Sequence, residues 1–180
     1  TIGDTANLDQ QLPLLGIRGF GQSEVQMVPL HMAMVAGTVA NEGRMMEPYV
    51  VAATFDNAGR ELNRKSSNVW KTPISRETAA IETELMIGVV ESGTASCCVD
   101  LDGDIQAAMK TGTAELGIES NPDLSHAWII GFAPAESPQY AISVVLTNVQ
   151  STEDVSATGG RLAGPIAEDV LNYLLTGEGA

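Results

Sequence analysis

The residues best equipped for chemistry form one short string, Lys110-Thr111-Gly112-Thr113. A cation, two hydroxyls and the neighbouring backbone N–H groups can hold a carboxylate and stabilise an oxyanion. Because adjacent strand residues point to opposite faces, Lys110 and Thr111 serve one ligand only where their strand borders a cleft. Gly112 leaves room for a ligand or a neighbouring helix to approach the backbone. Taken alone, the string is also consistent with an ordinary strand end that turns into a loop.

The remaining candidate groups carry weaker signals. Only two histidines are present, His31 and His126, and no spacing places both on one face, so we expect neither a metal site nor a cofactor. His31 lies among apolar neighbours of a predicted helix, where a structural role is expected, and the role of His126 stays open. Glu115 follows the string closely, and we expect it to line the same cleft, although carboxylates after strand ends are usually just solvated.

The chain contains two cysteines, Cys97 and Cys98, which are adjacent. They form no Cys-x-x-Cys motif and have no histidine at zinc spacing, so redox and metal functions are poorly supported. A bond between neighbouring cysteines conflicts with the usual Cα separation of a disulfide. We therefore expect two unpaired or differently paired thiols in a loop.

Three predicted strands position the string, which ends the first of them. The strands cover Ile105 to Thr113, Ala127 to Ala133 and Tyr140 to Val149. The last two are almost wholly apolar, which is typical of strands covered on both faces. The connection Glu136-Ser137-Pro138-Gln139 is short enough for an antiparallel hairpin.

Helical periodicity and capping residues predict the layers around these strands. One helix covers Pro29 through Ala40, a second follows the N-cap Ser75 to about Glu91, and a closing helix starts near Pro165. A hairpin is expected at the turn Asn57-Ala58-Gly59, and the stretch Ser151 to Gly160 has the composition of a mobile loop. These elements predict an α+β fold with an antiparallel sheet covered by helices on both faces.

Composition excludes several functional classes. The chain has 180 residues, 44% of them hydrophobic, and carries 9 Lys plus Arg against 23 Asp plus Glu, a formal net charge of −14. Nucleic acid and anionic lipid surfaces are poor partners, because both require clustered basic residues. The longest apolar run, Ala127 to Ala133, is far shorter than the roughly 20 residues that span a bilayer. The chain opens without an initiator Met, so we expect it to be a processed or excerpted polypeptide.

The string also belongs to a pattern that extends along nearly all 180 residues. The pattern comprises Gly19-Phe20-Gly21-Gln22, Val28-Pro29-Leu30-His31-Met32-Ala33, Ala40-Asn41-Glu42-Gly43 with Pro48, Val89-Val90-Glu91-Ser92-Gly93-Thr94-Ala95, the Lys-Thr-Gly-Thr string, and Ala127-Trp128-Ile129-Ile130-Gly131-Phe132-Ala133-Pro134. It resembles the C-terminal half of the transpeptidase domain of class B penicillin-binding proteins, of the division-associated penicillin-binding protein A type. The resemblance implies that residues 1–180 form the C-terminal portion of a single transpeptidase domain with the fold shared by serine β-lactamases.

The resemblance further implies an active-site serine acyltransferase that cross-links peptidoglycan stem peptides and is acylated by β-lactams. In this family Lys110 would supply positive potential and a hydrogen bond to the serine of the middle motif. Thr111 and Thr113 would bind the terminal carboxylate of the D-Ala-D-Ala donor or of a β-lactam. The backbone N–H of Thr113 would form half of the oxyanion hole.

Two family motifs are missing, and both are expected upstream. No serine of the chain has a lysine three residues later, so the nucleophilic Ser-x-x-Lys is absent. Ser66-Ser67-Asn68 satisfies Ser-x-Asn, but it follows the glycine-rich turn, whereas the family's motif precedes it, so we interpret it as a coincidental connector. Val28 replaces a small hydroxyl residue, and His31 replaces a frequent Gln. The family also implies the extracytoplasmic face of a bacterial membrane, an N-terminal anchor outside this chain, and division or cell-wall synthesis proteins as partners.

Two alternatives remain open from the sequence. A β-lactam sensor or a serine β-lactamase shares the strand motif on the same fold, and a β-lactamase would be distinguished by rapid deacylation. A non-enzymatic interaction domain would explain the missing nucleophile if the chain were complete. The intact Lys-Thr-Gly-Thr string disfavours that alternative.

Overall fold

The computed structural model describes residues 11–116, 124–153 and 155–177. Residues 1–10, where the chain opens without an initiator Met, lie outside these ranges. Position 154, in the expected mobile loop, lies outside them as well. The elements in chain order are α1 (Leu12–Gly19), α2 (Pro29–Ala40), β1 (Met45–Met46), β2 (Ala53–Phe55), β3 (Glu61–Arg64), β4 (Val69–Lys71), α3 (Arg76–Glu91), a 3₁₀ turn (Asp102–Asp104), β5 (Ala108–Glu115), β6 (Leu124–Ala133), β7 (Tyr140–Gln150), a π-helical turn (Gly159–Ala163) and α4 (Gly164–Thr176).

The central sheet is antiparallel, with the strand order β5-β6-β7. Lys110 lies opposite Ile130 and Gly112 opposite Trp128 in the register of β5 and β6. Within the described residues, β5 therefore forms an edge of the sheet. The predicted strands and the β6–β7 hairpin are confirmed, but two sets of bounds differ by more than one residue. Strand β5 covers Ala108–Glu115 rather than Ile105 to Thr113, because the 3₁₀ turn and its following residues occupy the preceding positions, and β6 starts at Leu124 rather than at Ala127.

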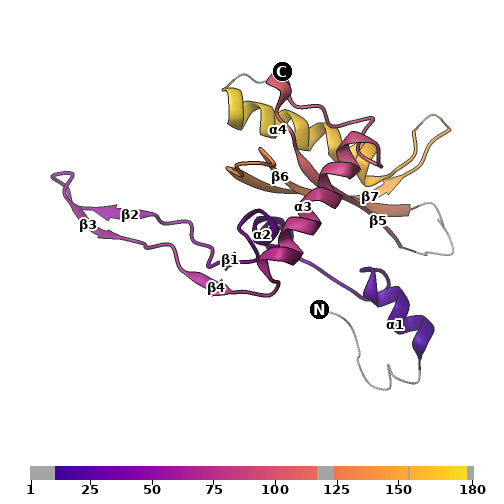
Figure 1. Ribbon diagram of the computed structural model, residues 1–180, viewed down its shortest axis with the longest axis horizontal. Coiled ribbons are helices and arrows are strands. Elements are labelled where there is room, and N and C mark those ends of the chain that lie inside the picture. The colour runs from indigo at the N-terminus through magenta and orange to yellow at the C-terminus, as the bar shows by residue number, and fades with distance from the viewer. Residues whose placement is uncertain (1–10, 117–123, 154, 178–180) are drawn as a thin grey trace.

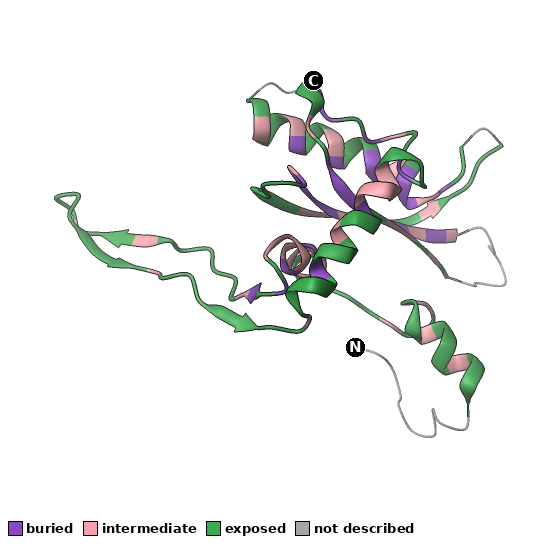
Figure 2. Ribbon diagram, viewed as in Figure 1, coloured by how far each residue is buried: buried purple, intermediate pink, exposed green. Residues whose placement is uncertain are grey.

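Helices cover both faces of this sheet (Figure 1), which confirms the predicted α+β class. On one face, Met109 and Ile129 are fully buried together with Ala167 and Leu171 of α4. On the other face, Ala108 and Phe132 pack with residues of α2 and α3, among them Met86. The alternation of Ala108 and Met109 between the two clusters follows from the two-residue period of a strand. Figure 2 shows this buried core concentrated along the sheet.

Local signals in the sequence set the helix ends. Ser75 caps α3 as predicted, because its hydroxyl accepts a hydrogen bond of 3.1 Å from the Thr78 N–H. Helix α2 begins after Val28, which offers no side-chain cap, but Pro29 occupies the first turn, where its missing N–H costs nothing. Gly177 ends α4 in the left-handed region, with φ of 77°. None of the helices in the described ranges is long and apolar enough to cross a bilayer.

Residues 45–71 form an arm that extends away from the sheet (Figure 1). In it β1 pairs with β4 and β2 with β3, both antiparallel. The predicted hairpin is confirmed: the Asp56 carboxylate closes the turn by accepting hydrogen bonds from the Ala58 and Arg60 N–H groups. The Arg60 N–H is the main reason that the pKa of Asp56 is lowered.

The stretch Ser151 to Gly160 differs from the expected mobile loop, because its second half is packed against the sheet. Ala157 is buried, and its carbonyl accepts a hydrogen bond of 3.1 Å from the Ser125 hydroxyl. Gly159 approaches the strands so closely that a Cβ there would lie 1.9 Å from the Trp128 carbonyl oxygen. Only a residue without a side chain fits this contact, and that requirement explains the glycine better than flexibility does.

Candidate active site

A cleft of about 1050 Å³ lies between the edge of the sheet and the turn that follows α1. The turn contributes Gly21 and Gln22, and the sheet contributes the apolar side chains of Trp128 and Ile130. All four residues of the Lys110–Thr113 string line this cleft, and so does Glu115. The condition set by the sequence is therefore met, because the strand that carries the string borders a cleft.

Strand β5 presents its polar side chains on two faces around one edge. Ala108 belongs to the cluster on the α2 side and Met109 to the cluster on the α4 side. Strand alternation then places Lys110 and Gly112 on the α2 side and the side chains of Thr111 and Thr113 on the α4 side. A ligand lying along this edge can contact both sets. A Cβ on Gly112 would meet the Trp128 Cβ at 3.5 Å, an ordinary van der Waals distance.

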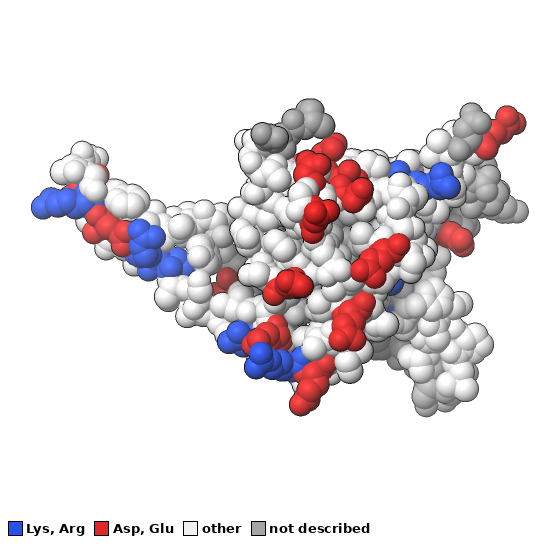
Figure 3. Space-filling view, turned by 45° about the horizontal axis from the view of Figure 1, so that its top comes forward, with Lys and Arg blue, Asp and Glu red and all other residues white. Residues whose placement is uncertain are grey.

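Lys110 places a positive charge in the cleft. Its ammonium donates a hydrogen bond of 2.5 Å to the backbone carbonyl of Thr111. Six of the chain's nine Lys and Arg side chains form ion pairs, but no described carboxylate lies within ion-pair distance of Lys110. Glu115 lies five residues farther along β5, at a rise of about 3.3 Å per residue, and so stands well away from the ammonium. Acidic side chains are instead spread over the visible surface (Figure 3). A carboxylate entering the cleft would therefore meet an ammonium that no described carboxylate neutralises.

Two contacts at the far end of the cleft were missed by the sequence analysis. The Gln22 side-chain amide donates a hydrogen bond of 3.2 Å to the backbone carbonyl of Glu115, which ties the glycine-rich turn to the end of β5. His126 lines the cleft, and its Nδ1 accepts a hydrogen bond of 3.1 Å from the Asn148 N–H. His31 is absent from this cleft and lies instead in a groove with Leu30 and Trp70.

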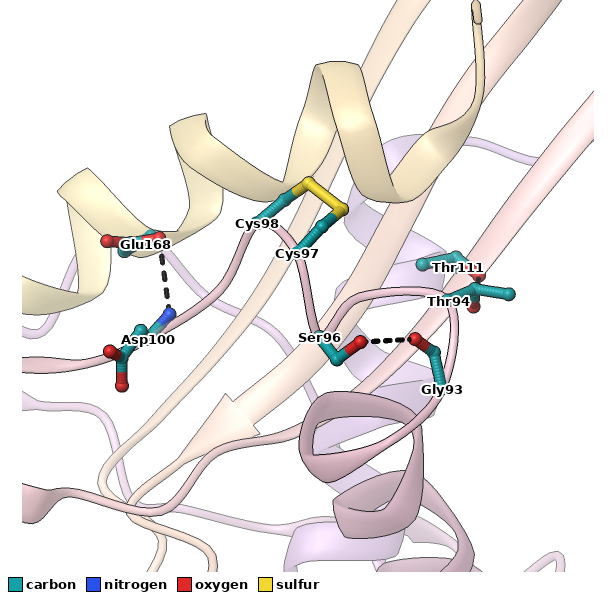
Figure 4. Close-up of a disulfide and its surroundings, with 8 residues drawn as sticks. All are labelled: Gly93, Thr94, Ser96, Cys97, Cys98, Asp100, Thr111 and Glu168. Carbon is teal, nitrogen blue, oxygen red and sulfur yellow. Dashed lines mark hydrogen bonds between the residues drawn. A yellow bond between two sulfur atoms is a disulfide. The ribbon is translucent and has the colours of Figure 1, made fainter.

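A third missed residue is Thr94, in the loop between α3 and the 3₁₀ turn. Its Oγ1 lies 2.6 Å from the Oγ1 of Thr111, a hydrogen-bonding distance. Figure 4 shows the two side chains meeting where this loop passes the β5 strand. The segment had been noted in the sequence only as part of a family pattern, and 17 residues separate the two hydroxyls.

The same loop corrects the expectation for the cysteines. Cys97 and Cys98 form a disulfide with each other, with their Cα atoms 3.7 Å apart (Figure 4). The expectation of unpaired or differently paired thiols was wrong, because it treated the usual Cα separation of a disulfide as a requirement. The Ser96 and Cys98 N–H groups bond back to the Gly93 and Ala95 carbonyls, so the loop turns tightly and both sulfurs reach one side.

The serine-containing string Ser66-Ser67-Asn68 lies between β3 and β4 in the arm, and none of its residues lines the cleft. The Asn68 carbonyl accepts a hydrogen bond from the Glu47 N–H within the arm. Lys65 and Asn68 also hydrogen-bond the Glu47 carboxylate and lower its pKa. These contacts are consistent with a connector in the arm.

Comparison with known proteins identifies the family. The sequence model of one protein family, the penicillin binding protein transpeptidase domain, matches residues 7–172. The chain belongs to the penicillin-binding protein transpeptidase family. It is 38% identical over 167 residues to the peptidoglycan D,D-transpeptidase PbpA of Mycobacterium tuberculosis, covering 91% of this chain and 32% of that protein. The chain thus spans about a third of the length of this relative.

Solved structures agree with the sequence match. The crystal structure of PBPA from Mycobacterium tuberculosis superimposes with a TM-score of 0.80 and 34% identity, covering 95% of this chain and 39% of that chain. The penicillin G acyl-enzyme complex of the same organism's penicillin-binding protein A gives a TM-score of 0.80 and 34% identity over 97% of this chain and 37% of that chain. The resemblance stated from the sequence motifs is therefore confirmed for the family and for the fold.

Proposed function

We propose that this chain is the C-terminal portion of a single transpeptidase domain in a peptidoglycan D,D-transpeptidase. The enzyme would cross-link stem peptides by acyl transfer through an active-site serine, in bacterial cell division or cell-shape maintenance, and β-lactams would acylate it. The observation that carries the proposal is the position of Lys110, Thr111 and Thr113 along one strand edge that borders a cleft, with no described carboxylate paired to the Lys110 ammonium. The family match over residues 7–172 supports the same function.

The string residues take distinct roles in this proposal. Lys110 raises the positive potential where the substrate carboxylate and the developing oxyanion lie. The hydroxyls of Thr111 and Thr113 donate hydrogen bonds to the carboxylate of the D-Ala-D-Ala donor or of a β-lactam. The Thr113 N–H contributes half of the oxyanion hole, and Glu115 borders the far end of the substrate groove.

The rest of the machinery would come from elsewhere in the polypeptide. The nucleophilic serine and its lysine belong to an upstream Ser-x-x-Lys motif, and an upstream Ser-x-Asn supplies the middle motif. The whole protein would act at the extracytoplasmic face of the cell membrane, held by an N-terminal anchor. Cell-wall synthesis or division proteins would be its partners there.

Intact-mass spectrometry of the native full-length polypeptide tests the proposal. After exposure to penicillin G, the mass should increase by one penicillin, and the adduct should map outside residues 1–180. A stable adduct favours a transpeptidase or a sensor, whereas rapid loss of the adduct would identify a β-lactamase. If nothing is acylated, the non-enzymatic alternative replaces the proposal.

Substitution of Lys110 tests the role of the strand edge. Lys110→Ala should slow acylation by about 100- to 1000-fold, because it removes the cation beside the developing charge. The melting temperature should change little, since the ammonium forms no ion pair within the described residues. Lys71→Ala is the matched control, because Lys71 lies in the arm, 4.5 Å from the centroid of the Trp70 ring, outside the cleft. Equal acylation rates for the two variants would contradict the assignment.

A further inference from the structure

The contact between Thr94 and Thr111 joins the strand motif to a loop whose residues have no role in the proposed function. The two Oγ1 atoms are 2.6 Å apart, and either hydroxyl can be the donor. The Thr94 side chain is exposed and Thr111 is half-buried, so the contact lies at the surface of the sheet edge. Figure 4 shows the loop bringing Thr94 to Thr111 from the end of α3.

Two contacts hold the backbone at Thr94 and Ala95. The next residue, Ala95, is fully buried, and its N–H donates a hydrogen bond of 3.1 Å to the Val89 carbonyl. A Cβ on Gly160 would lie 2.0 Å from the Thr94 carbonyl oxygen, so the π-helical turn packs directly on this peptide. The same Cβ would lie 3.5 Å from the Thr111 Cγ2. Backbone packing therefore helps to fix the position of the Thr94 hydroxyl.

A hydroxyl has one proton to donate and can also accept. If Thr111 donates its proton to a substrate carboxylate, Thr94 must be the donor in the pair. Hydrogen bonds in such a chain polarise and strengthen one another. The alternative orientation, in which Thr111 donates to Thr94, would leave Thr111 with only lone pairs toward the negative carboxylate.

We infer that Thr94 is a positioning residue: its hydroxyl donates to Thr111 and thereby directs the Thr111 proton at the substrate carboxylate. This inference rests on the proposed function. Because the carboxylate is present both before and during acyl transfer, Thr94 acts on ground-state and transition-state binding alike. Its loss should weaken the noncovalent penicillin complex and leave the first-order acylation step unchanged.

Single substitutions in the full-length polypeptide test this role through acylation kinetics with penicillin G. Thr94→Val removes the hydroxyl at nearly constant shape and should raise the dissociation constant of the noncovalent complex by about 2- to 10-fold. Thr94→Ser should restore the wild-type constant, because it keeps the donor. Ser96→Ala is the matched control: it removes a hydroxyl of the same loop that donates to the Gly93 carbonyl, at 2.8 Å, and should change nothing. Thr94→Ala serves if the valine variant does not fold.

A double-mutant cycle separates positioning from general stability. In a Thr111→Val background, Thr94→Val should have no further effect on the dissociation constant, because the hydroxyl that it orients is gone. Equal constants for wild type and Thr94→Val would overturn the inference while leaving the proposed function intact. Additive effects in the cycle, or an effect confined to the acylation step, would overturn it as well. Absence of acylation in the wild type would refute the proposed function and this inference with it.

Discussion

Gly159→Ala should destabilise the protein by closing the gap between the π-helical turn and the sheet. The added Cβ would lie 1.9 Å from the Trp128 carbonyl oxygen and 2.6 Å from the Gly112 carbonyl oxygen. Ordinary contacts are more than 1 Å longer than the first of these distances, so the turn or the strands must shift. Overpacking of this kind costs about 1–3 kcal/mol. A loss of that size lowers the melting temperature of a chain this long by roughly 2–4 °C per kcal/mol.

The matched control is the same substitution in helix α3. A Cβ on Gly88 would meet no other described residue within 4 Å outside its own helix turn. Glycine in a helix interior is less favourable than alanine by about 0.5–1 kcal/mol, so Gly88→Ala should raise the melting temperature. Thermal unfolding followed by circular dichroism measures both variants. Gly159→Ala should also slow acylation by penicillin G, because Gly112 lies in the strand motif. A melting temperature at or above the wild-type value for Gly159→Ala would refute the packing argument.

Two further predictions concern stability. Burial raises the pKa of Glu168, although the Asp100 N–H opposes this by donating to its carboxylate at 3.2 Å. The folded state therefore binds more protons than the unfolded state just above the ordinary pKa, and the free energy of unfolding falls as the pH rises through the folded-state pKa. Glu168→Gln should be more stable than wild type at pH 7, by less than about 1 kcal/mol because the side chain is only half-buried. This advantage should vanish near pH 4, and urea unfolding at both pH values tests it. Ser75→Ala should cost about 1 kcal/mol by removing the cap on the Thr78 N–H, and a urea midpoint equal to that of the wild type would contradict this.

Local signals carried most of the secondary structure. The helix predicted from Pro29 through Ala40 has those bounds, and Ser75 caps α3 as expected, because a proline and a cap act on their own helix turn. The hairpin at residues 57–59 follows equally from side-chain bonds to the neighbouring backbone. The predicted start of β5 was wrong. The strand begins only after a 3₁₀ turn in which Gly103 has φ of 69°.

The loop expectations failed because composition does not report packing. Residues 157–160 are rich in small residues, which suggested mobility, yet the small side chains permit close contact with the strands. The adjacent cysteines were judged by the usual Cα separation of a disulfide, yet the two sulfurs bond across the 3.7 Å between neighbouring Cα atoms. In neither case did composition or average geometry predict the contact that forms.

The sequence by itself determined the fold class, the order of the three strands and the string Lys110-Thr111-Gly112-Thr113, because strand period, helix period and motif spacing are local properties of the chain. Tertiary structure alone decided that β5 is an edge of the sheet formed by the described residues and that a cleft runs along it. It also brought Thr94 to Thr111 and Gln22 to Glu115, across 17 and 93 residues. Such contacts depend on how strands, turns and helices pack against one another, and a local pattern of residues does not specify contacts between segments so far apart in the chain.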